Sequence, residues 1–96
     1  MYARHVTYHA EPGTRDRVVG IIEGLMPRVR QQSGFIGMLM LVDEEHNEYV
    51  GVSQWQTRAD AEAVTTSILP LAMQELASVL DNPPVTRIYE VHESRL

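Results

Sequence analysis

The chain has 96 residues, of which 44% are hydrophobic and 22% are charged, and we expect one globular domain over residues 1–96. It contains no cysteine, which excludes disulfides, a thiol nucleophile and a thiolate metal site. The formal net charge is −5, and the eight basic residues are arginines scattered along the chain. Because they form no basic stripe, the sequence argues against nucleic acid as the main partner.

The first half of the chain predicts a strand, a helix and a second strand. Residues 2–9 alternate in character, as a strand does. The two faces of this strand are Tyr2, Arg4, Val6 and Tyr8 on one side and Ala3, His5, Thr7 and His9 on the other. Apolar residues at helical spacing then predict a helix that begins after Thr14 and ends before Gly34. Residues 35–42, FIGMLMLV, are apolar on both faces, which is typical of a strand buried on both sides.

The second half begins with a charged hairpin, DEEHNE, which leads into a strand over residues 49–56. Thr57 and Asp60 form a pair similar to a capping box, so we expect a helix to begin at Thr57. The sequence TTS interrupts this helix, and Pro70 fits the first turn of a further helix that reaches Leu80. A last strand is expected over residues 85–92.

The predicted order is therefore β-α-β-β-α-β, with the second helix broken in two. This order defines an α+β, ferredoxin-like split β-α-β fold, in which helices cover one face of a four-stranded antiparallel sheet. Both faces of the strand over residues 35–42 are apolar, so both should be buried. In a monomer the face of the sheet without helices would expose an apolar area larger than soluble proteins usually tolerate. We therefore predict a homodimer that packs two sheets face to face.

Three features carry a resemblance to a known family: the strand order, the segment GFIGMLMLVD after the first helix, and the segment SQWQTRADAEAV. With them the chain resembles the antibiotic-biosynthesis-monooxygenase family, within the dimeric α/β-barrel superfamily. The family includes cofactor-independent oxygenases of polycyclic phenols and quinols, haem-degrading oxygenases, and many members without known activity. The resemblance covers nearly all 96 residues and implies the fold far more firmly than the chemistry.

The resemblance implies that Trp55 lines a cavity between sheet and helices, where its N–H meets a ligand or a backbone carbonyl; a plain packing role is the alternative. If the odd-numbered face of the first strand lines the same cavity, His5 is a candidate general base, and an ordinary half-buried histidine is the alternative. Trp55 would then donate a hydrogen bond to the substrate. The candidate substrate-binding residues are Phe35, Met38, Met40, Met73 and Tyr89.

Haem and metals are not expected. Haem-degrading members of the family bind iron through a helix histidine, and that position falls near Met73 here. His46 stands among carboxylates in the hairpin, but this segment lacks the spacing and the glycine of a calcium loop, so we interpret it as a solvated turn. Arg4, Tyr8 and Arg87 either line a cavity of the dimer, paired with Glu90 or a carboxylate of the partner chain, or lie at a wet end of the barrel.

The resemblance and the residues together predict a cofactor-independent monooxygenase acting on an aromatic or quinol small molecule. Such oxygenation begins with the loss of a phenolic proton, for which His5 would be the base. The alternative is a non-catalytic small-molecule-binding or stress-associated protein of the same fold. No apolar run is long enough for a membrane span, and the N-terminus does not resemble a signal peptide, so a cytoplasmic location is expected.

Overall fold

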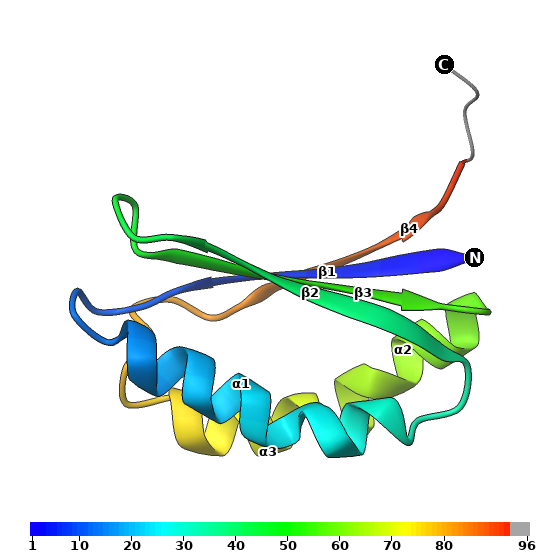
Figure 1. Cartoon of the computed structure of the whole chain (residues 1–96), viewed down its shortest axis with the longest axis horizontal. Helices are drawn as coiled ribbons and strands as arrows, with labels where there is room; N and C mark the ends of the chain where they lie inside the picture. Colours follow the sequence, from blue (N-terminus) through cyan, green and yellow to red (C-terminus); the bar gives the residue numbers. More distant parts are fainter. Residues whose placement is uncertain (93–96) are drawn as a thin grey trace.

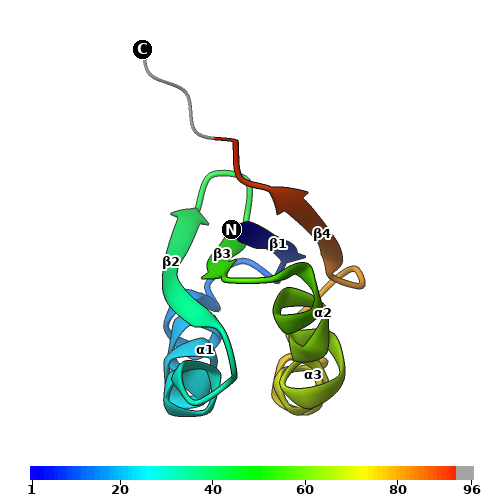
Figure 2. The same ribbon diagram turned by 90° about the vertical axis from the view of Figure 1, so that its right-hand side faces the viewer.

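The structure, a computed structural model, describes residues 1–92 and confirms the predicted α+β, ferredoxin-like fold. Strands β1 (Tyr2–His9), β2 (Phe35–Asp43), β3 (Glu48–Trp55) and β4 (Val85–Glu90) form one antiparallel sheet in the order β2-β3-β1-β4. Helices α1 (Arg15–Arg30), α2 (Arg58–Ser67) and α3 (Leu69–Leu76) lie together against one face of this sheet (Figure 1). In the end view, α1 lies on the side of β2 and the pair α2 and α3 on the side of β4 (Figure 2).

The pairing of β1 with β3 decides which residues face the helices. Tyr2 is opposite Trp55, and Arg4 is opposite Ser53. Residues directly opposite each other point to the same side of a sheet. The even-numbered residues of β1 therefore face the helices, where Val6 and Tyr8 join the buried core. The odd-numbered residues of β1 point to the opposite side of the sheet.

The broken second helix is confirmed, although the break falls later than predicted. The sequence TTS belongs to α2, and the break lies at Ile68. A threonine hydroxyl can bond back to a carbonyl of its own helix, as Thr66 Oγ1 does by donating to the carbonyl of Ala63 at 3.0 Å. The third helix ends at Leu76 rather than Leu80, and β4 ends at Glu90, two residues before the predicted end.

The end of β3 is held by the predicted helix cap. Thr57 Oγ1 accepts a hydrogen bond from the backbone N–H of Asp60 at 3.1 Å. The N–H of Gln56 donates to the carbonyl of Gly34 at 2.9 Å, which ties this corner to the start of β2. Gly34 has a φ of +78°, and the Asp60 side chain occupies the place of a Cβ atom there. Glycine is favoured here because it adopts a positive φ without strain and has no Cβ atom to collide with the Asp60 side chain.

Strand β2 is apolar on both faces, as predicted, but the helices cover only one of them. Met38 and Met40 face the helices, since they are opposite Ser53 and Gly51. Leu39 and Leu41 point away, with 66% and 50% of their surfaces exposed. A bulge at residue 36 shifts the register between Phe35 and Gly37. The apolar residues exposed on the sheet are Ile36, Leu39, Leu41, Val85 and Tyr89. None of the helices in the described part of the chain is long and apolar enough to cross a membrane.

Candidate functional site

A cavity lies between the helix-covered face of the sheet and the three helices. Its solvent-accessible volume is about 50 Å³, within about 530 Å³ of space between atoms that includes the open mouth. Most of the wall is apolar, and three side chains with polar groups, those of Arg4, Tyr8 and Ser53, reach it from the central strands. The apolar wall consists of Val6, Ile22, Leu25, Met26, Val29, Met38, Met40, Val64, Ile68, Leu69 and Ala72, together with Gly51. An apolar pocket with a few convergent polar groups is the usual form of a small-molecule site.

Arg4 is the most unusual group in this wall. It is a charged residue of which only 5% is exposed. Its Nε has no hydrogen-bond partner, and its Nη2 donates to Thr65 Oγ1 over a long 3.5 Å. Among residues 1–92, no carboxylate forms an ion pair with it. Burial lowers the pKa of the Arg4 guanidinium, and the neighbouring Tyr8 partly offsets this effect, but an arginine side chain in a protein stays charged.

Tyr8 is the second polar group of the cavity. Its side chain lies on the same face of β1 as Arg4. Burial raises the pKa of its phenol, and the charge of Arg4 partly offsets that rise. Tyr8 is therefore a neutral hydroxyl at neutral pH and does not supply a negative charge to Arg4.

Tyr8 should make the protein less stable in alkali. Because its pKa is raised in the folded state, the unfolded chain loses this proton first, at about pH 10. The stability contributed by the protonated phenol is complete below that pH and is lost as the pH rises through the folded-state pKa. Denaturant unfolding between pH 8 and pH 11 should show a shallower loss of free energy of unfolding in Tyr8→Phe than in the unaltered protein. Parallel curves would contradict this assignment.

Trp55 is fully buried at the end of β3 and uses its N–H inside the protein. The indole Nε1 donates to Ser53 Oγ at 2.8 Å. The ring of Phe35 meets the indole edge-on, with centroids 5.4 Å apart. Neither aromatic residue is part of the cavity wall. The geometry thus favours the packing role for Trp55, with Ser53 as the partner of its N–H in place of a ligand or a carbonyl.

The prediction that His5 and Trp55 share one cavity is wrong. His5 is opposite Val52 on β3 and Arg87 on β4, whereas Trp55 is opposite Tyr2, so the sheet lies between the imidazole and the cavity. Burial of Val6 and Tyr8 turns the even-numbered face of β1 inward, and His5 follows the odd-numbered face outward. The catalytic role predicted for His5 therefore loses the geometry on which it depended.

The other predicted site residues divide between the two sides of the sheet. Met38 and Met40 line the cavity, as expected. Tyr89 does not, because it lies on the open face, half-exposed, with its ring 6.3 Å from that of His5. Met73 is a half-buried residue of α3 outside the cavity wall. The cavity lining contains no histidine within residues 1–92, so the residues present do not fit a histidine-bound haem.

The three polar residues of the cavity wall, Arg4, Tyr8 and Ser53, were not among the predicted site residues, although Arg4 and Tyr8 were considered as residues that line a cavity of the dimer. For Arg4, a signal was present in the sequence. A lone arginine alternates with Tyr2, Val6 and Tyr8, the more apolar set of its strand, and a charged residue in such a set is rarely placed there for packing alone. For Ser53, the signal is its position two residues before Trp55, which puts both side chains on one face of the strand.

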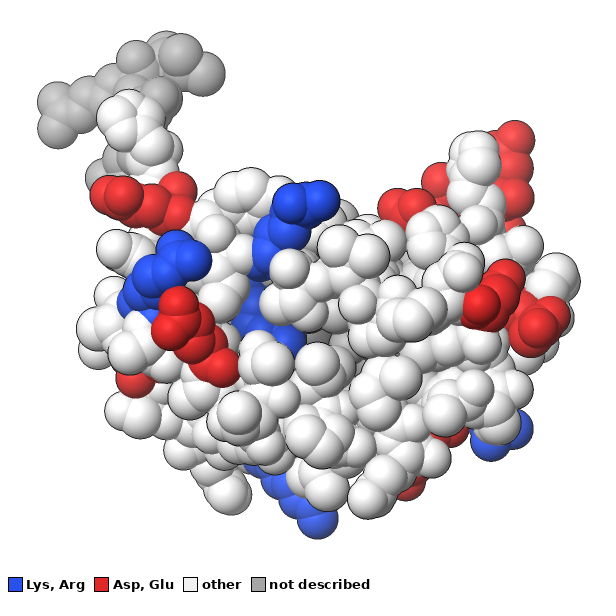
Figure 3. All heavy atoms as spheres, turned by 180° about the vertical axis from the view of Figure 1, so that it is seen from behind, with Lys and Arg blue, Asp and Glu red and all other residues white. Residues whose placement is uncertain are grey.

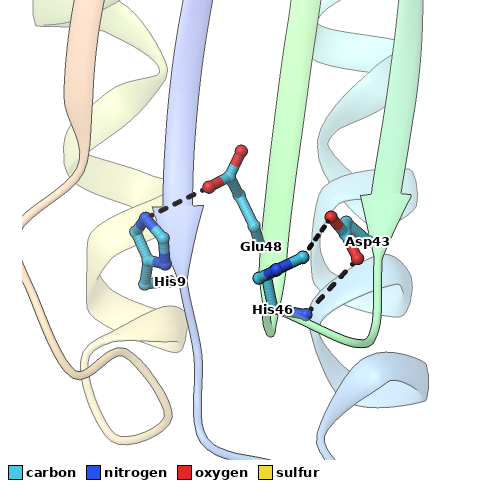
Figure 4. A network of polar contacts seen from close by, with 4 residues as sticks. All are labelled: His9, Asp43, His46 and Glu48. Carbon is cyan, nitrogen blue, oxygen red and sulfur yellow. Dashed lines mark hydrogen bonds and ion pairs between the residues drawn. The ribbon is translucent and has the colours of Figure 1, made fainter.

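The hairpin end of the sheet carries a separate polar network, shown in Figure 4. His46 Nδ1 lies 2.8 Å from Asp43 Oδ2, and the backbone N–H of His46 donates to Asp43 Oδ1. These hydrogen bonds hold the pKa of Asp43 below its usual value. Beside them, His9 Nε2 lies 3.4 Å from a carboxylate oxygen of Glu48. Asp43, Glu45 and His46 could together approach one ion, but all three are exposed, in agreement with a solvated turn.

The surface around the molecule is unevenly charged. On the side opposite to that of Figure 1, acidic side chains gather toward the two ends and the middle is mostly uncharged (Figure 3). Basic atoms are visible there below the level of the surrounding surface, in a hollow of the uncharged middle.

A ferredoxin-like sheet with helices on one face and an apolar cavity beneath them defines a class of small α+β proteins. The family model for antibiotic biosynthesis monooxygenase matches residues 1–76. The chain belongs to this family, which confirms the resemblance seen in the sequence. No functionally curated protein matches the sequence.

Solved structures agree with this assignment at the level of the fold. A monooxygenase from the gene ActVA-Orf6 of Streptomyces coelicolor, in complex with the ligand nanaomycin D, is 19% identical with a TM-score of 0.80, over 99% of this chain and 90% of that one. The NE2512 protein of unknown function from Nitrosomonas europaea is 19% identical with a TM-score of 0.81, over 99% and 92%. Rv0793 from Mycobacterium tuberculosis is 14% identical with a TM-score of 0.78, over 97% and 96%.

Proposed function

We propose that the cavity binds an aromatic small molecule of the quinol or anthrone type, and that the protein oxidises it with dioxygen without a bound cofactor. The observation that carries this proposal is the cavity itself, an apolar space with three polar groups on its sheet side. Family membership supports it, as does the ligand complex of the Streptomyces coelicolor monooxygenase.

The reaction needs only dioxygen as a co-substrate. An anthrone loses a proton to give an electron-rich anion, which passes one electron to dioxygen. The resulting radical and superoxide combine in a carbon–oxygen bond, and the peroxide anion takes up a proton in place of the one lost at the start. The hydroperoxide then loses water. The sum is one anthrone and one dioxygen giving one anthraquinone and one water, so a methylene carbon becomes a carbonyl. The cavity would hold the ring among methionine and aliphatic side chains and keep bulk water from the peroxide.

A non-catalytic binding protein is the second candidate, and one observation favours it. The polar groups in the cavity wall are an arginine, a tyrosine with a raised pKa and a serine. None of these is a good proton acceptor at neutral pH, so the proton of a substrate would have to leave to water. A protein of this kind would bind the aromatic ligand and leave it unchanged.

Oxygen uptake with a panel of anthrones and naphthoquinols separates the two candidates. Ala72 is buried in the cavity wall, so Ala72→Met should fill the space and reduce uptake at least tenfold. Ala77, which directly follows the end of α3, is exposed, and Ala77→Met is a matched control that should react as the unaltered protein does. Uptake no faster than the uncatalysed background with every substrate would leave the binding role as the function.

The open face of the sheet supports a further part of the proposal, a homodimer. Its exposed apolar residues include Leu39, Leu41, Val85 and Tyr89. A second copy packed face to face would cover them and bury roughly 2,000 Å² or more in total, as obligate interfaces do. His5 would then lie between the two sheets, away from either cavity.

A further inference from the structure

We propose that Arg4 is an anion-binding group, and that the cavity takes a flat apolar molecule carrying one oxyanion, a phenolate or a carboxylate, directed at the guanidinium. This inference deepens the proposed function and rests on it for the place of the ligand. It does not require that the ligand be oxidised.

The first support is the lack of a counter-ion. Buried charges in proteins are nearly always paired, and Arg4 has only 5% of its surface exposed. The described residues give its Nε no partner and give the guanidinium no carboxylate. The contact with Thr65 Oγ1, at 3.5 Å, is at the limit of a hydrogen bond. An anion brought by a ligand would supply what the chain itself does not.

The second support is the surroundings of the guanidinium. Tyr8, its neighbour on β1, is a neutral phenol at neutral pH, because the ordinary pKa of tyrosine is about 10 and burial raises the pKa of Tyr8 further. The remaining wall near the strands is apolar or small, with Met38, Met40 and Gly51. A charge in such a low-dielectric space interacts strongly with a charge of opposite sign. The site therefore favours a ligand whose acidic oxygen is ionised over a neutral ligand of the same shape.

Ser53 adds a second polar point to the site. Its Oγ accepts the Trp55 N–H at 2.8 Å, and its own hydroxyl donates to the carbonyl of Arg4 over 3.5 Å. The weakness of that second bond leaves the Ser53 hydroxyl able to donate to a ligand oxygen instead. A ligand with one oxyanion near Arg4 and a second oxygen near Ser53 would use both.

Paired probes test the inference without reference to oxidation. We would measure binding of 2-naphthoate, its neutral isostere 2-naphthamide, and 2-naphthol by titration calorimetry. A charge-assisted hydrogen bond predicts that the unaltered protein binds 2-naphthoate about 10- to 100-fold more tightly than 2-naphthamide. The 2-naphthol arm distinguishes the two oxyanions. Ionisation of bound naphthol, seen in its absorption spectrum at a pH below its solution pKa, would assign the site to phenolates, and its absence would assign the site to carboxylates.

Variants at Arg4 then locate the effect. Arg4→Met keeps the length of the side chain and removes the charge, so it should weaken 2-naphthoate binding at least tenfold and change 2-naphthamide binding less than threefold. Arg4→Lys should keep part of the preference, because the charge remains but the planar fork is lost. Arg30 is an exposed arginine of α1, and Arg30→Met should leave all three affinities unchanged.

The thermal midpoint of the ligand-free protein separates a binding role from a structural one. Replacing a buried unpaired charge by an apolar side chain is often neutral or stabilising, so Arg4→Met should melt at the same temperature or higher. A lower midpoint, together with unchanged probe affinities, would make Arg4 a structural residue and overturn the inference.

The relative affinities of the unaltered protein for 2-naphthoate and 2-naphthamide test the preference of the cavity for an anion even if Arg4→Met fails to fold. Equal affinities for 2-naphthoate and 2-naphthamide would overturn the inference. No binding of any probe would overturn the inference and the proposed ligand site together. A clear preference for 2-naphthoate without oxygen uptake on any anthrone would support Arg4 as the anion group while the oxygenase proposal fails.

Discussion

Replacing Leu39 and Leu41 by glutamate should convert a two-chain assembly into single chains. Both side chains are at least half-exposed on the open face of the sheet, so a single chain gains little from them. In a symmetric dimer the interface contains both leucines from each of the two chains, so four leucine side chains are covered. At about 1 kcal/mol for each partly covered leucine, four side chains contribute about 4 kcal/mol, which is roughly a thousandfold in the dissociation constant. Burial of the new carboxylates would weaken the assembly further.

Sedimentation at micromolar concentration measures this directly. The unaltered protein should sediment at twice the 10.9 kDa mass of one chain, and the double variant at the mass of one. Ala63 is exposed on α2, on the helix side of the sheet, so Ala63→Glu adds a charge without touching the open face and should remain dimeric. A folded, unaltered protein that sediments as a single chain would refute the dimer.

Replacing Trp55 by alanine should cause the largest loss of stability of any single substitution considered. Trp55 is fully buried, and truncation of such a side chain costs about 3–5 kcal/mol because the surroundings collapse only partly. For a domain of this size, that loss lowers the melting temperature by roughly 15–30 °C. Calorimetry or circular dichroism would measure the shift, and a change below about 5 °C would show that the indole is not central to the core.

The contribution of the Trp55 N–H can be separated from that of the ring. Trp55→Phe keeps much of the apolar area and leaves Ser53 Oγ without its donor, so an intermediate loss of about 1–2 kcal/mol is expected. Ser53→Ala removes the acceptor. If the hydrogen bond contributes, the loss in the double variant should be smaller than the sum of the two single losses by about 0.5–1.5 kcal/mol. Strict additivity would assign the whole effect to packing.

Local sequence patterns predicted most of the fold. The order of strands and helices follows from the periodicity of apolar residues, from Gly34 at the end of the first helical segment and from Pro70 at the start of a later helix. These signals depend only on residues close together in the sequence. Thr57 and Asp60 form their cap as predicted, because a capping bond joins residues three positions apart. The break between α2 and α3 was expected, but its position at Ile68 was not, since helix propensity at threonine and serine is weak enough for packing to override.

The candidate site was predicted much less well than the fold. Alternation showed that His5 and Arg4 lie on opposite faces of β1, but it did not say which face is inward. The family resemblance placed Trp55 in the cavity, whereas its N–H is bonded to Ser53 and its ring packs on Phe35. Met38 and Met40 do line the cavity, as expected of its apolar wall, and their role in substrate binding stays a prediction.

The sequence by itself determined the succession of elements, the two apolar faces of β2 and the membership of this chain in its family, because these depend on local periodicity and short motifs. Only the tertiary structure decided that Arg4 rather than His5 enters the cavity. That choice depends on the register between β1 and β3 and on the burial of Val6 and Tyr8 against the helices. The packing of distant elements places a guanidinium in the cavity wall, where no carboxylate of residues 1–92 forms an ion pair with it.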